Sequence, residues 1–137
     1  MKRAIVAGVV LGLTFMASGV LLSQTVYTGL IFDARGSSFV PSASVKIQDE
    51  DGREVYGSAY VSKEWAEKQG IVGYAKTLDD ARANPRVAGS PLVVKALRAA
   101  GPNNKDLVIS NEDARKIRDL ARNFNFLDQA KVLVVVP

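Results

Sequence analysis

The sequence predicts an α+β fold: a mixed β-sheet of about five to seven strands with one main helix and two short helices, preceded by an N-terminal apolar signal or anchor helix. Residues 131–136 are almost continuously apolar, which is typical of a strand covered on both faces. Residues 110–124 carry apolar side chains at spacings of three and four, which is typical of an amphipathic helix. Residues 4–22 form an uncharged apolar run near the N-terminus.

The N-terminal run has the features of an export signal. Lys2 and Arg3 precede it, and the small residue Ser23 follows it. The run is nearly long enough to cross a hydrocarbon core of ~30 Å, so a retained membrane anchor is the alternative. Gln24 follows Ser23 at the point where a bacterial lipoprotein carries its lipidated cysteine, and the chain therefore cannot take that lipid.

Two regions follow from this interpretation. Residues 1–23 are expected to be a signal peptide or N-terminal membrane anchor, and residues 24–137 a single α+β domain. The expected localisation is outside the cytoplasm: the protein is exported, either free in the periplasm or tethered on the periplasmic side. Membrane contact is expected only through the N-terminal segment, if it stays uncleaved.

The first half of the domain predicts a strand, an irregular connection and a hairpin. Residues 26–33 are rich in β-branched and aromatic side chains, whereas residues 37–44 contain serines and a proline. Residues 45–48 and 53–56 flank Asp49-Glu50-Asp51-Gly52. An Asp-Gly pair between two short strands favours a tight turn.

Capping residues predict two short helices around a brief strand. Ser62 is placed to cap a helix over residues 63–69, and Thr77 to cap one over residues 78–83. Gly70 and Pro85 end these helices. The intervening residues 71–75 predict a strand.

The C-terminal part predicts strands over residues 92–99, 106–109 and 131–136, with Pro91 at a possible start of the first. Ser110 or Asn111 caps the main helix, which is expected to reach about residue 124. This helix is expected to connect the last two strands in a parallel, right-handed β-α-β unit.

The composition excludes most familiar catalytic chemistry. The chain has no cysteine and no histidine, so it lacks the ligands of an ordinary structural zinc site and the imidazole of a Ser-His-Asp triad. Without Lys2 and Arg3, 18 basic residues become 16 against 14 acidic ones, a net charge of +2. That balance does not favour nucleic acid as a partner. We expect no catalytic residue, no metal and no cofactor.

The acidic segment at residues 49–52 does not fit a calcium loop. With Gly52 at the sixth position of an EF-hand, Ile47 and Ser58 would take the first and twelfth positions, and neither is a carboxylate. A polar hairpin tip is the simpler interpretation. Asp79 and Asp80 are likewise explained by their place at the start of a short helix.

Six residues are candidates for ligand or partner binding. Tyrosine and tryptophan are enriched at contact surfaces, and arginines beside loop glycines favour anions. The candidates are Arg35, Tyr56, Tyr60, Trp65, Tyr74 and Arg86.

Several segments together resemble the C-terminal module of bacterial envelope lipoproteins of the flagellar-assembly type, which build discs around the motor at the outer membrane. The resemblance covers nearly all of residues 24–137 and rests on the segments TGLIFDARG (28–36), DEDG (49–52), VYG (55–57), VGYA (72–75), PLVVKA (91–96) and VIS (108–110). It implies a non-enzymatic envelope component that associates with itself or with flagellar outer-ring proteins.

Two hypotheses on function follow. The first is an exported structural or assembly domain that binds copies of itself or other envelope proteins. It would bind through exposed strand edges and through the aromatic residues Tyr56, Tyr60, Trp65 and Tyr74. The alternative is a periplasmic module that binds a small ligand or a cell-wall fragment through Arg35, Arg86 and backbone amides near Gly36 and Gly89. Neither hypothesis involves enzyme activity.

Overall fold

The computed structural model describes residues 26–137. The predicted signal or anchor over residues 1–23 lies outside the described residues. Within the described part, no helix combines the length and apolar character that crossing a membrane requires.

The described residues form strands, α-helices and 3-10 helices. The strands are β2 (Gly29–Asp33), β3 (Ile47–Gln48), β4 (Glu54–Tyr56), β5 (Gly73–Ala75), β6 (Pro91–Lys95), β7 (Arg98–Ala100), β8 (Asp106–Val108) and β9 (Val132–Val135). The helices are η2 (Ser58–Tyr60), α2 (Lys63–Gln69), α3 (Leu78–Ala83), η3 (Pro102–Asn104) and α4 (Asn111–Ala121).

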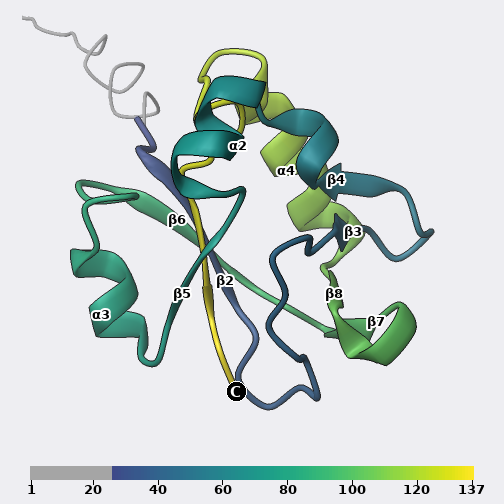
Figure 1. The fold of residues 1–137 in the computed structure, drawn as a ribbon. Helices are drawn as coiled ribbons and strands as arrows, with labels where there is room; N and C mark the ends of the chain where they lie inside the picture. Colours follow the sequence, from purple (N-terminus) through teal and green to yellow (C-terminus); the bar gives the residue numbers. More distant parts are fainter. Residues whose placement is uncertain (1–25) are drawn as a thin grey trace, which may run out of the picture.

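The strands of residues 26–137 form two sheets of four. The first sheet has the order β5-β9-β2-β6, and all of its strand pairs are parallel. The second has the order β4-β3-β8-β7 and is mixed, because only β3 and β8 run parallel. Figure 1 shows the parallel sheet in the middle, with α3 on its left and the second sheet on its right. The α+β class, with one main helix and two short ones, is confirmed.

Both faces of the parallel sheet are buried. Leu30 and Phe32 of β2 contribute to the main core, which the sheet shares with the second sheet and α4. Ile31 belongs to a separate cluster with Ala81 of α3 on the opposite face. All of β9 is buried between β5 and β2, which confirms that residues 131–136 contain an interior strand.

The hairpin and the helix caps confirm the local predictions. β3 and β4 pair antiparallel around residues 49–52, and Gly52 has the positive φ of 85° that this turn requires. The side chains of Ser62, Thr77 and Ser110 each accept the amide hydrogen three residues later, at the starts of α2, α3 and α4. Local chemistry therefore defines where these helices begin.

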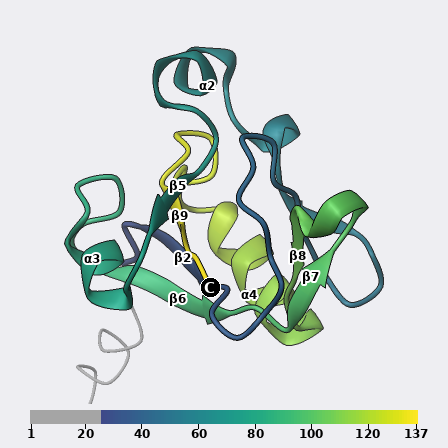
Figure 2. The same cartoon turned by 60° about the horizontal axis from the view of Figure 1, so that its bottom comes forward.

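The strand predicted over residues 92–99 is in fact two strands in different sheets. The Ala96 amide donates to Asp33 O in β2 (3.0 Å), but the next amide, that of Leu97, donates to Val108 O at the end of β8 (2.7 Å). In both views β6 runs from the side of α3 toward the second sheet, where β7 continues (Figures 1 and 2). The chain therefore links the sheets at this point.

The predicted β-α-β unit is wrong. β8 belongs to the mixed sheet and β9 to the parallel sheet, so α4 connects two sheets rather than two strands of one. The apolar stripe of α4 is still buried, through Ala114 and Ile117. The helix packs into the core between the two sheets. The prediction had placed it on one face of a single sheet.

The Ile117→Ala change should lower the free energy of unfolding by about 2–5 kcal/mol, because it leaves a cavity at a fully buried position. Urea unfolding of the full-length protein measures this loss. Arg115→Ala, on the exposed face of the same helix, is the matched control and should change the value by no more than about 0.5 kcal/mol. Equal effects of the two changes would contradict the described packing of α4.

Candidate functional site

Arg35 is engaged in a local ion pair at the end of β2. Its guanidinium donates to both carboxylate oxygens of Asp33, at 2.9 and 2.8 Å, and its own amide donates to the same carboxylate. These hydrogen bonds lower the pKa of Asp33 against the opposing effect of burial, and Lys95 adds a weaker attraction. The pair stabilises the turn that leaves β2.

Arg86 ties its own segment to two others, the end of α2 and the segment before β9. Its guanidinium donates to the carbonyl oxygens of Gln69 (3.1 Å), Gly70 (2.8 Å) and Ala130 (2.7 Å). No carboxylate of residues 26–137 forms a salt bridge with it. Burial lowers the pKa of Arg86, opposed by its interaction with Tyr56. The carbonyl groups at the end of α2 provide the negative partial charge that this cation needs.

The two arginines lie at opposite ends of the parallel sheet. Arg35 follows the carboxyl end of β2, whereas Arg86 contacts the segment immediately before β9 begins. Because β2 and β9 run parallel, these positions do not meet. The structure therefore does not bring Arg35 and Arg86 into one ligand site.

Tyr56 and Tyr74 each bind the backbone of another segment through the side-chain hydroxyl. Tyr56 is fully buried, its hydroxyl donates to Ile71 O, and burial raises the pKa of this hydroxyl. The Tyr74 hydroxyl donates to Ser42 O and accepts from the Ser42 amide at 2.8 Å. Burial also raises the pKa of Tyr74. Both tyrosines use their polar end to fix a loop.

Trp65 and Tyr60 are more accessible. Trp65 of α2 is half-buried, and Lys68 Nζ lies 5.1 Å from the centre of its ring. Tyr60 of η2 is 40 % exposed and lines a groove. Two other candidates, Tyr74 and Arg86, line a separate hollow of about 410 Å³ together with Gln69, Gly73, Asn84, Pro85 and Leu133. The structure therefore brings Tyr74 and Arg86 together and places Tyr60 in a different groove.

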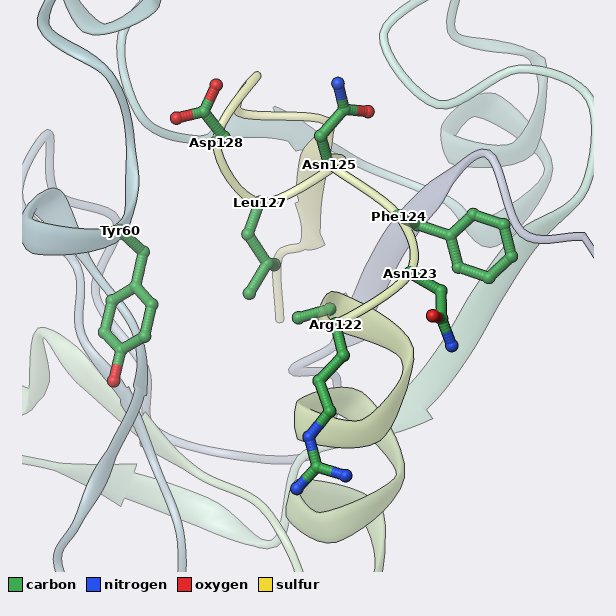
Figure 3. Close-up of a pocket in the computed structure, with 8 residues that line it drawn as sticks. Tyr60, Arg122, Asn123, Phe124, Asn125, Leu127 and Asp128 are labelled. Atoms are coloured by element: carbon green, nitrogen blue, oxygen red, sulfur yellow. The ribbon is translucent and has the colours of Figure 1, made fainter.

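The groove lies between η2 and the segment that follows α4, and has a volume of about 610 Å³. Figure 3 shows Tyr60 on one side, the chain from Arg122 to Asp128 on the other, and Leu127 pointing into the space between them. Its lining residues are Tyr60, Ala121, Arg122, Asn123, Phe124, Asn125, Leu127 and Asp128. The lining is mixed: aromatic, aliphatic, amide and charged.

The second wall of the groove contains none of the six residues predicted to bind a ligand or partner. Arg122, Asn123 and Asn125 lie just beyond the apolar stripe of the main helix, where polar residues are ordinarily solvated. A sequence signal existed in the alternation of polar and aromatic residues over positions 123–126, but nothing local indicates that Tyr60 faces it.

The acidic hairpin tip encloses one buried carboxylate. Asp49 is only 1 % exposed and accepts the amide hydrogens of Asp51 (3.0 Å) and Arg53 (2.9 Å). The guanidinium groups of Arg118 and Arg53 lie 3.1 and 3.3 Å from its Oδ2. Asp49 thus connects the hairpin to α4.

A second pair of hydrogen bonds reinforces the connection between the hairpin and α4. Glu50 and Asn111 exchange hydrogen bonds, each donating its amide to the other's side chain at 2.9 Å. The Glu50 carboxylate therefore satisfies one of the free amide groups at the start of α4. Within residues 26–137, no group of three or more acidic side chains is placed to hold a metal ion. The bonds of Asp49 and Glu50 to Arg118 and Asn111 make the tip a structural clamp between the hairpin and α4.

Comparison with protein families identifies a relationship that spans most of the chain. A family model described as Treponema pallidum Tp0624, second domain, matches residues 29–137. The chain belongs to this family. Its matched region begins at β2 and ends at the C-terminus, so it contains both sheets, α4 and the groove.

A search of curated proteins found no match. Membership of the Tp0624 second-domain family is consistent with a bacterial module of the envelope type.

The Asp49→Asn change should make stability less dependent on pH. Burial raises the pKa of Asp49, but its hydrogen bonds to Arg53, Arg118 and Asp51 outweigh this effect and hold the pKa below the ordinary value of 3.8. A lowered pKa stabilises the fold above the ordinary value, and this contribution disappears as the pH falls through the lower value of the folded protein.

The measurement is urea unfolding of wild type and Asp49→Asn at pH values from about 7 to about 2.5. The wild type should be the more stable above about pH 5, and the difference should narrow steadily below about pH 4. Asp51→Asn, at the exposed neighbouring position, should leave the stability at pH 7 nearly unchanged. A constant difference across the range would contradict the ionised, hydrogen-bonded Asp49.

Proposed function

We propose that this protein is a non-enzymatic, exported structural or assembly domain of the bacterial envelope, and that it associates with copies of itself through the open edge of β6. The sequence motifs that resemble flagellar-assembly lipoproteins support a role next to the flagellum. The single observation that carries the proposal is that β6 lies at the edge of the parallel sheet formed by residues 26–137.

β6 is an apolar edge strand among the strands that the structure describes. Of these strands, only β2 is its neighbour, so one edge of β6 pairs with no described strand. The Ala96 amide points to β2, and the direction alternates along a strand, so the backbone groups of Val93 and Lys95 point away from the sheet. An edge of this kind is a template for pairing with another strand.

A second copy matches this edge in an antiparallel arrangement centred on Val93. The two Val93 residues exchange both of their outward hydrogen bonds, and each Lys95 amide donates to the Pro91 carbonyl of the other copy. Pro91 has no amide hydrogen, which limits the pairing to this short stretch. The register also sets each Lys95 opposite a proline, which avoids a direct pair of like charges.

A strand-edge variant tests the proposal. Val93→Pro removes the central outward amide and should weaken self-association at least ~10-fold, as measured by analytical ultracentrifugation of the full-length protein over a range of concentrations. Val93→Ala is the matched control, because it shortens the side chain but keeps the amide, and it should stay close to the wild type. Circular dichroism checks that both variants fold.

Two results would refute the assembly role. One is a wild-type protein that stays monomeric at high concentration and cross-links to no envelope protein in cells. The other is equal self-association of the Val93→Pro variant and the wild type, which would place the contact elsewhere than β6.

A further inference from the structure

We propose that the groove between Tyr60 and residues 121–128 is a binding site for a saccharide chain. The groove shares no residue with β6, so this inference stands independently of the proposed self-association. It rests on a fixed aromatic face, a rigid polar wall and a balance of charge.

The aromatic face of the groove is held in place before any ligand arrives. The Tyr60 hydroxyl donates to Glu54 O at 2.9 Å, and the ring packs on the fully buried Tyr56 with 6.4 Å between the ring centres. Despite these contacts Tyr60 remains 40 % exposed. A fixed ring loses little conformational freedom on binding, which favours affinity.

The two walls of the groove are tied to each other. The Ser62 amide, next to η2, donates to Asp128 O at 3.1 Å across the groove. The amides of Asn123 and Phe124 donate to Leu120 O at the end of α4, each at 3.0 Å. Backbone bonds of this kind hold the segment after α4 at a defined distance from Tyr60.

The floor and rim of the groove differ in character. Leu127, only 7 % exposed, forms an apolar floor, and its side chain points between the two walls (Figure 3). Asn125 and Asp128 stand at the rim, and Arg122, from the same wall, extends along α4. Phe124 points away from Tyr60 and stacks on Phe126 with 6.0 Å between the ring centres, which leaves Tyr60 as the aromatic surface of the groove.

This combination suits sugar rings. The C–H face of a pyranose is apolar and packs against an aromatic ring, while its hydroxyl groups both donate and accept hydrogen bonds. Planar amide, carboxylate and guanidinium groups present paired donors or acceptors to neighbouring hydroxyls. Arg122, Asn125 and Asp128 supply all three of these groups.

Other ligand classes fit the lining less well. Arg122 already forms an ion pair with Asp119 at 3.2 Å, and Asp128 adds a negative charge, so the groove has no excess of positive charge to hold a phosphate. An extended peptide often binds by adding a strand to an open sheet edge, whereas loop side chains line this groove. The carbonyl oxygen of Glu54 in β4, beside the groove, already accepts a hydrogen bond from Tyr60 and is not free for a peptide amide. An oligosaccharide segment needs neither feature.

Titration with chitotetraose tests the proposal, with cellotetraose as a second sugar that lacks N-acetyl groups. The full-length protein is labelled with ¹⁵N and, if it is anchored, kept in a detergent without a sugar headgroup. We expect chemical-shift changes in the amides of residues 58–62 and 121–128 with either sugar. Tyr60→Ala should weaken binding at least ~10-fold, since stacking is lost.

Two variants distinguish loss of stacking from damage to the fold. Tyr60→Phe keeps the ring and should retain binding within about 3-fold of the wild type. Trp65→Ala removes a neighbouring aromatic ring outside the groove and should bind as the wild type does. The proposal is overturned if neither sugar shifts the groove amides at millimolar concentration, if the changes map elsewhere, or if an extended peptide alone produces them.

Discussion

The fold depends on burying both faces of the two central parallel strands, β2 and β9. Their side chains point alternately into the main core and into the smaller cluster beneath α3, and no residue of either strand is exposed. Two such strands cannot stand at a surface, so each face of the sheet needs a covering layer. The short helix α3 covers one face, and the mixed sheet together with α4 covers the other.

A polar clamp complements this apolar constraint. Asp49 and Glu50, at the tip of the β3-β4 hairpin, bind Arg118 and Asn111 of α4. The mixed sheet and the helix therefore meet in one orientation, and hydrogen bonds that need exact geometry reinforce the less directional packing of the core. That orientation also brings η2, which follows the hairpin, to the end of α4, and so places Tyr60 opposite the segment that completes the groove.

Much of the local structure could be predicted because it depends on neighbours in the sequence. Ser62, Thr77 and Ser110 cap helices through amides three residues away, and the Asp-Gly turn needs only the freedom of Gly52. The candidate site could be predicted much less well from the sequence. Tyr56 and Tyr60 are the same residue type four positions apart, yet one is fully buried and the other forms the wall of the groove. Their difference arises from the turn of η2 and from contacts with the distant end of α4.

By itself, the sequence determined most of the elements, the helix caps and the double-sided burial of residues 132–135, because hydrophobic periodicity and capping act over a few residues. Only the tertiary structure decided which sheet each strand joined. The amides of Ala96 and Leu97 are adjacent in the chain but bind partners in different sheets, and no local pattern distinguishes them. The groove could not be predicted for the same reason: no local pattern links its two walls, which lie some 60 residues apart in the sequence. They meet through packing and through a backbone hydrogen bond between Ser62 and Asp128.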